Sequence, residues 1–133
     1  YKLAPMDEKM RKLSNVRKLW QGIMKVQEIR DIFTGQPVKE TQYDVDHFIP
    51  WSFVKDDKIW NLVLSCAECN ERKNSKIPVK NYLVKIENRN KKVQTINNVI
   101  VQSDFSGYSD DLLDRMWHYA KLSGMKEYIV DSN

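Results

Sequence analysis

Residues 43–50 read Tyr-Asp-Val-Asp-His-Phe-Ile-Pro, residues 61–64 read Asn-Leu-Val-Leu, and residues 66–73 read Cys-Ala-Glu-Cys-Asn-Glu-Arg-Lys. From 42 to 49 polar side chains alternate with apolar or aromatic ones, which predicts a half-buried strand that ends at the proline. The apolar run 62–64 predicts a second, short buried strand. Ser65 is then a candidate N-cap, with Glu68 as its capping-box partner, for a short helix that continues to about Asn74. The centre of the chain is therefore predicted to fold as strand, loop, strand and helix.

Helical patterns flank this segment on both sides. Residues 6–30 place apolar side chains on one helical face, at Leu13, Val16, Trp20 and Ile23. Residues 79–92 predict a further helix. Residues 93–108 give no clear prediction, and within them 93–101 fit either a helix or a strand. Residues 110–122 return to a helical pattern, with Ser109 as the N-cap and Gly124 as the stop signal. The sequence thus predicts an α+β domain with helical extensions on both sides of its centre.

The composition is that of one folded domain. The chain has 133 residues, and its hydrophobic fraction of 41% is sufficient for a packed core. No apolar run approaches the roughly 20 residues that cross a bilayer, so we expect no membrane partner. The absence of a signal-peptide pattern and the presence of two cysteines predict a reducing, cytoplasmic location. Because the first residue is Tyr1 rather than methionine, we expect the chain to be a fragment of a longer protein.

Charge is unevenly distributed along the chain. Residues 1–30 and 61–92 each carry eight Lys/Arg and three acidic residues, whereas residues 31–60 and 93–133 each carry three and six. An acidic site between basic flanks suits a metal ion together with a polyphosphate strand. Arg72, Lys73, Lys76 and Lys80 follow one another around the central helix, and we interpret them as a track for nucleic-acid phosphates.

Four polar residues of the central segment are candidates for chemistry. The strand, loop, strand and helix order brings Asp46, His47, Asn61 and Asn70 to the point where two strands meet one helix. Asp46 and the amide oxygen of Asn70 are hard ligands that suit Mg²⁺ or Mn²⁺. His47 can accept a proton from water near neutral pH. A divalent ion beside an imidazole is the combination that phosphodiester hydrolysis requires.

One geometric condition applies to this pair. Adjacent residues of a regular strand point to opposite faces of the sheet, so Asp46 and His47 can share a site only under special conditions. The strand must end or distort at this point, or the metal must lie near the edge of the strand.

With these residues the segment resembles the HNH endonucleases, whose ββα-metal motif has Asp-His on the first strand, Asn before the second, and Asn or His on the helix. The resemblance is closest to the HNH nuclease domain of the RNA-guided CRISPR effector nucleases. That domain has a similar Tyr-Asp-Val-Asp-His segment followed by Pro, Ser-Phe and Lys-Asp-Asp, which here are residues 43–47, 50, 52–53 and 55–57. The similarity covers roughly residues 30–78.

The resemblance implies a single HNH nuclease domain over residues 1–133, with an N-terminal helix at 6–30, a ββα-metal core at 31–78 and a helical extension at 79–133. It implies His47 as the general base, Asp46 and Asn70 as ligands of Mg²⁺ or Mn²⁺, and Asn61 as the residue that holds the loop orienting His47. Lys73 matches a basic residue that commonly follows the helix Asn. The implied activity is hydrolysis of DNA, in a restriction or phage-defence setting among others, with specificity supplied by further domains or a partner.

The resemblance also raises the question of zinc. Many HNH domains bind a structural zinc ion through two Cys-x-x-Cys pairs. Cys66 and Cys69 supply the second pair, but residues 31–34 (Asp-Ile-Phe-Thr) stand in place of the first. Asp31 is a potential third ligand, and a threonine is a poor fourth. We therefore expect no structural zinc, and we expect the apolar residues of 31–34 to support the motif by packing.

Other interpretations stay open at this point. The chain can be a catalytically inactive nucleic-acid-binding module built on the same fold, or a protein-interaction domain that uses its helices. Trp20 and Trp117 have the spacing of helical core residues. Trp51 and Trp60 flank the loop beside the site and suit either packing or stacking on bases. His118 is expected to be an ordinary surface or packing residue.

Overall fold

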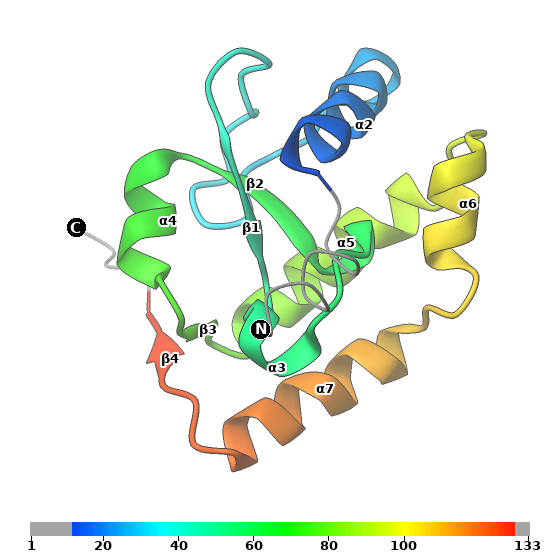
Figure 1. Ribbon diagram of the computed structural model, residues 1–133. Helices are drawn as coiled ribbons and strands as arrows, with labels where there is room; N and C mark the ends of the chain where they lie inside the picture. The colour runs from blue at the N-terminus through cyan, green and yellow to red at the C-terminus, as the bar shows by residue number, and fades with distance from the viewer. Residues whose placement is uncertain (1–11, 130–133) are drawn as a thin grey trace.

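The computed structural model describes residues 12–129, and within them it shows a mixed α+β fold that is mostly helical (Figure 1). Its elements in chain order are α2 (Leu13–Val26), β1 (Asp44–His47), α3 (Trp51–Val54), the 3₁₀ turn η1 (Ile59–Asn61), β2 (Leu62–Ser65), α4 (Ala67–Lys73), β3 (Ile77–Pro78), α5 (Asn81–Val93), α6 (Val99–Phe105), α7 (Asp110–Leu122) and β4 (Glu127–Tyr128). None of the helices within 12–129 has the length and apolar character that crossing a bilayer would require.

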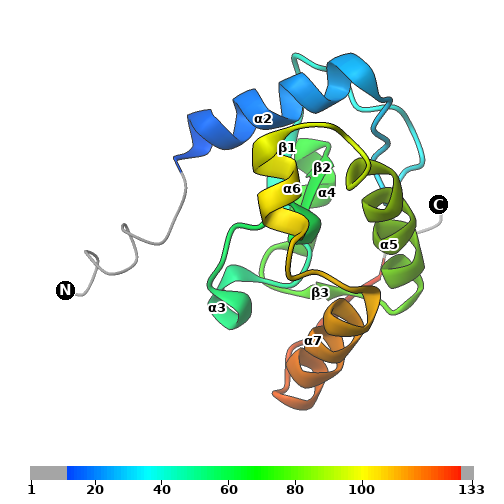
Figure 2. The same cartoon turned by 90° about the vertical axis from the view of Figure 1, so that its right-hand side faces the viewer.

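The central strands pair in antiparallel fashion. In this register Asp44 faces Ser65 and His47 faces Leu62. Since side chains alternate along a strand, Asp44 and Asp46 point to one face of the pair and His47 to the other. α4 packs against β1, and the two views place it on one side of the strand pair with α6 on the other (Figures 1 and 2).

β1 is shorter than the strand predicted from the alternating pattern. It ends at His47, and the next two residues, Phe48 and Ile49, are fully buried in the core. The backbone N–H and C=O of Ile49 bind the side chain of Asn61 instead of a partner strand. The predicted strand 42–49 was therefore wrong by two residues at each end. At its C-terminal end the reason is that a side chain takes over the backbone hydrogen bonds.

The N-cap predicted for the helix after β2 was also wrong. Ser65 is the last residue of β2 and is buried opposite Asp44. Cys66 caps α4 instead, and its Sγ accepts a hydrogen bond from the backbone N–H of Cys69 at 3.3 Å. The strand extends one residue further than its apolar letters indicate, and this displaces the start of the helix.

α2 confirms a helix within the described part of the predicted range 6–30, but the predicted end at residue 30 was wrong by four residues. Val16, Trp20 and Ile23 are buried as expected, but Leu13 is 57% exposed because it lies in the first turn of the helix, beyond the core. The helix ends at Val26, where the next residue has an extended backbone. The start predicted at residues 6–11 lies outside the described residues.

The C-terminal part contains three helices and a closing strand. α5 and α7 match the predicted ranges to within about two residues, and α6 shows that the ambiguous stretch 93–108 contains a helix. Ser109 Oγ accepts from Leu112 N at 3.0 Å, as predicted for an N-cap. Gly124, with φ of 95°, ends α7 in a left-handed conformation that favours glycine. β4 then pairs in parallel with β3.

These helices hold the turn that leads into β2. The buried carboxylate of Asp104 in α6 accepts from Ile59 N at 2.9 Å, and Trp60 Nε1 donates to the backbone oxygen of Asp104 at 3.1 Å. From α5, Arg89 donates to Leu62 O at 2.6 Å and Asn90 donates to Trp60 O at 2.9 Å. The C-terminal extension therefore fixes the backbone on either side of Asn61.

Replacing Asp104 tests this dependence. Asp104→Ala leaves the buried Ile59 N–H without its acceptor, so the free energy of unfolding should fall by about 1–3 kcal/mol. Urea denaturation of the variant against the unmodified chain measures the change. Ser103→Ala, at the neighbouring exposed position of α6, is the control and should be nearly neutral. Equal stability of both variants would show that Asp104 does not secure this turn.

Candidate active site

Two carboxylates of β1 face polar side chains of α4. Asn70 Nδ2 donates to Asp44 Oδ2 at 3.0 Å, and Lys73 Nζ lies 3.1 Å from Asp46 Oδ2. The amide of Asn70 is oriented by Asp44, and because it donates through nitrogen, its oxygen remains a potential ligand. The geometry brings Asn70 and Asp46 to the same β1–α4 contact, but the residue that binds Asn70 directly is Asp44.

His47 is held by an acidic partner from the loop after α3. Its Nε2 lies 2.6 Å from Oδ1 of Asp57, a carboxylate that is only 6% exposed. A ring nitrogen that faces a carboxylate carries the proton, which leaves the lone pair of a neutral imidazole on Nδ1. The arrangement fixes both the orientation and the tautomer of His47, as a general base requires.

Asp46 and His47 border the same surface hollow. It has a volume of about 250 Å³ and is lined by Asp46, His47, Pro50, Trp51, Ser52, Asn74 and Ser75. Two neighbours on a strand can share a site where the strand ends, and β1 ends at His47, after which the chain bends. Neighbouring residues on opposite faces of a strand thus reach a common space at its end.

Asn61 fixes the chain that leaves His47. It is fully buried, its Oδ1 accepts from Ile49 N at 2.9 Å, and its Nδ2 donates to Ile49 O at 3.0 Å. Its backbone oxygen also accepts from Phe48 N at 2.7 Å. Asn61 contacts neither His47 nor Asp46 through a hydrogen bond, so its position suits a structural support of the loop.

The four basic residues predicted as a phosphate track are not equivalent. Arg72, Lys76 and Lys80 are exposed, and Arg72 pairs with Glu68 one turn earlier at 2.6 Å. Lys73 is fully buried against Asp46. Burial lowers the pKa of Lys73, and the Asp46 carboxylate opposes this shift by favouring the charged form. Lys73 therefore does not lie on an exposed track, since it turns inward from the helix.

The tryptophans, which are candidates for core packing or base stacking, fall into two groups, buried and half-buried. Trp20 and Trp117 are buried in the core, as their spacing predicts. Trp60 is buried as well, with its indole N–H on the backbone of α6, and it is not available to stack on bases. Trp51 is half-buried and lines the hollow beside His47. His118 is exposed on α7, as expected.

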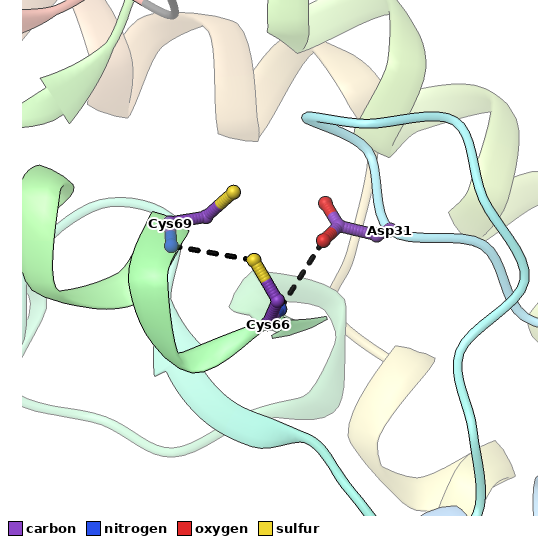
Figure 3. Close-up of side chains that lie close together, drawn as sticks. All are labelled: Asp31, Cys66 and Cys69. Carbon is purple, nitrogen blue, oxygen red and sulfur yellow. Dashed lines mark hydrogen bonds between the residues drawn. The ribbon is translucent and has the colours of Figure 1, made fainter.

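A second group of potential ligands lies at the other end of α4. The ligand atoms of Asp31, Cys66 and Cys69 all lie within 4.8 Å of one another, and among the residues 12–129 no other set of three His, Cys, Asp or Glu is grouped in this way (Figure 3). Burial raises the pKa of Cys69 to about 12, and the hydrogen bond with Cys66 and the charge of Asp31 add to the shift. The thiol form is therefore strongly favoured at neutral pH.

The carboxylate of Asp31 links its own turn, residues 31–34, to the first residues of α4. Its Oδ1 accepts from Phe33 N at 2.7 Å, and its Oδ2 accepts from Cys66 N at 3.2 Å. Ile32 and Phe33 are buried, which confirms the expected packing of this segment. Thr34 is exposed, and its hydroxyl accepts from Gln36 N. Hydrogen bonds thus connect the 31–34 turn to the start of α4.

The donors at the β1–α4 contact fit a hard divalent cation. Oxygen is the donor atom of Asp46 and remains available on Asn70, and the group facing Asp46 Oδ2 is the ammonium of Lys73 at 3.1 Å. The sequence interpretation missed two residues of this site, Asp44 and Asp57. Asp44 could have been found because it lies two residues before Asp46 and so shares its face, whereas no local spacing points to Asp57.

We predict that the two cysteines are dispensable for folding. The Cys66→Ser/Cys69→Ser variant should fold with its free energy of unfolding reduced by about 1–3 kcal/mol, through loss of packing and of the cap. Circular dichroism and elemental analysis of both proteins test this. One tightly held zinc ion per chain, lost together with the fold in the variant, would overturn the prediction.

Comparison with known proteins supports the sequence resemblance. Residues 31–79 match the HNH endonuclease family. The CRISPR-associated endonuclease Cas9 of Streptococcus mutans is 37% identical over 65 residues, or 47% of this chain and 5% of the relative. The Cas9 of Listeria innocua is 38% identical over 56 residues, or 40% of this chain and 4% of the relative, so the chain spans a small part of either protein. The resemblance to HNH endonucleases is thus confirmed, and it is carried by residues 31–79.

Proposed function

We propose that this chain is a metal-dependent HNH nuclease domain that hydrolyses DNA phosphodiester bonds, with His47 as the general base. The observation that carries the proposal is the shared hollow at the end of β1, where Asp46 and an imidazole oriented by Asp57 meet. A potential metal ligand and an oriented base next to one accessible space are the parts that hydrolysis of a phosphodiester needs.

His47 would remove a proton from the attacking water through Nδ1. Asp57 would keep the proton on Nε2 and stabilise the imidazolium that forms, so it is a positioning residue for the base. Asn61 would keep the chain after His47 in place through its bonds to Ile49. His47 would thus act on the water, Asp57 on His47, and Asn61 on the backbone that follows His47.

Asp46 and Asn70 would hold one Mg²⁺ or Mn²⁺, with Asp44 orienting the amide of Asn70. The bound ion would supply charge stabilisation for the transition state and for the departing oxygen. One carboxylate and one amide are few ligands for Mg²⁺, which releases its waters reluctantly, so substrate phosphate oxygens should complete the coordination.

DNA would reach this hollow across a basic surface. Three basic side chains are exposed on α4 and on the segment after it, Arg72, Lys76 and Lys80. Contacts between such side chains and DNA phosphates provide affinity without sequence readout. The relatives are far longer than the matched segment and are CRISPR-associated endonucleases. We therefore propose that other domains or a partner select the site of cleavage.

The two histidines of the chain allow a matched test of the general base. His47→Ala should reduce the cleavage rate of plasmid DNA in Mg²⁺ by about 10²- to 10⁴-fold with little change in DNA affinity, because the chemical step loses its base. His118→Ala, on the exposed surface of α7, should cleave like the unmodified chain. Cleavage by His47→Ala at the unmodified rate would refute the assignment. DNA binding without cleavage by any of the three proteins would instead favour the inactive binding module.

The metal dependence of cleavage tests Asn70. Asn70→Ala removes an oxygen ligand and should abolish cleavage in Mg²⁺, with partial rescue in Mn²⁺, which tolerates irregular coordination better. Glu71→Ala, at the next and exposed position of α4, is the control. Cleavage is measured against metal concentration for each protein. The same metal dependence in Asn70→Ala and in the unmodified chain would mean that Asn70 is not a ligand.

A further inference from the structure

The most unusual charged group near the site is Lys73. It is the last residue of α4, and its side chain is fully buried although its helix neighbours Glu71 and Arg72 are exposed. Its Nζ lies 3.1 Å from Asp46 Oδ2, and the side chains are 1% and 20% exposed. Lysine is almost never fully buried unless it is paired, so its position needs a compensating charge.

Asp46 supplies that charge. Among the described residues Lys73 is the one cation within ion-pair distance of Asp46, and neither of the two facing atoms has another hydrogen-bond partner there. Separating them would leave one buried or half-buried charge without compensation, which is costly. The ammonium and the carboxylate thus hold each other in place.

This pairing has a consequence for the metal, given the proposed role of Asp46. The oxygen that faces the ammonium is the one that otherwise lacks a partner, and a divalent cation bound there would lie next to a positive charge. Like charges at such short range repel strongly, most of all where water is scarce. Ammonium and metal therefore compete for one carboxylate.

We propose that Lys73 is the resident counter-ion of Asp46. In the metal-free protein the ammonium neutralises Asp46 and keeps its carboxylate at the end of β1, and a divalent cation must displace the ammonium from this oxygen. Lys73 is then a positioning residue that keeps Asp46 in place and weakens metal binding to the free protein. The proposal rests on the proposed function, because that is what makes Asp46 a metal ligand.

The direction in which the metal affinity changes when Lys73 is replaced separates this role from a purely structural one. Damage to the fold weakens ligand binding, whereas removal of a competing cation strengthens it. Lys73→Met keeps the buried chain length without the charge, and isothermal titration with Mn²⁺ and Mg²⁺ should show binding about tenfold tighter than in the unmodified chain. Lys73→Arg keeps the charge and should stay as weak as the unmodified chain. Lys91→Met, at an exposed position of α5, controls for net charge and should leave the metal affinity unchanged.

Melting temperatures provide a second readout. In EDTA, Lys73→Met should melt below the unmodified chain, since Asp46 loses its counter-ion, and Mn²⁺ should raise its melting temperature by more than it raises that of the unmodified chain. Lys73→Gln takes the place of the methionine variant if the latter does not fold. Metal affinity equal to or weaker than that of the unmodified chain, in a folded variant, would overturn the proposal.

Asp46→Asn distinguishes the counter-ion role of Lys73 from the proposed metal site. Loss of metal binding in Asp46→Asn together with unchanged affinity in Lys73→Met would refute the counter-ion role and leave the proposed metal site standing. Unchanged metal binding in Asp46→Asn would refute Asp46 as a ligand, and with it both proposals. Loss of binding in Asp46→Asn and a gain in Lys73→Met is the expected result.

Discussion

The side-chain amide of Asn61 satisfies both backbone polar groups of Ile49, and the rest of the site depends on this contact. Both residues are fully buried, so the two hydrogen bonds cannot be replaced by water without opening the core. They fix where β1 stops and how the chain leaves His47. They also close the loop that carries Asp57. α5 and α6 add hydrogen bonds to the backbone around Asn61, so helices distant in sequence help to position a loop beside the hollow.

The polar side chains of the site occur as pairs, each joining two elements. Asp44 binds Asn70, Asp46 faces Lys73, and His47 binds Asp57. The first two pairs join β1 to α4, and the third joins β1 to the loop before η1. Because every partner comes from another element, packing determines the orientation of each candidate side chain in the free protein. Such preorganisation reduces the reorientation that a reaction would otherwise require.

The sequence predicted the elements well and their polar contacts less well. Alternation and helical spacing located both strands and the helices α4, α5 and α7, because these patterns follow from burying one face of an element. The same signals failed where a side chain replaced a regular backbone interaction, as Asn61 does at Ile49 and Cys66 does at the start of α4. The residues next to Lys73 in the sequence give no sign that it is buried. Its burial is explained only by the carboxylate of Asp46 across the β1–α4 contact. Asp57 likewise becomes a partner of His47 only through the tertiary fold.

The parallel pairing of β3 with β4 affects the order in which the molecule is assembled. Ile77 pairs with Glu127, so this contact closes a long loop, whereas β1, β2 and α4 pack within a short stretch of chain. Contacts between distant positions form late in folding, because ordering a long loop opposes them. During synthesis on the ribosome, β1, β2 and α4 would therefore emerge well before β4. Only once β4 has emerged could it pair with β3, the strand that follows α4 in the chain. The candidate site residues of a nascent chain would be present but incompletely supported, and we expect the site to take its final geometry only once the C-terminal segment has docked.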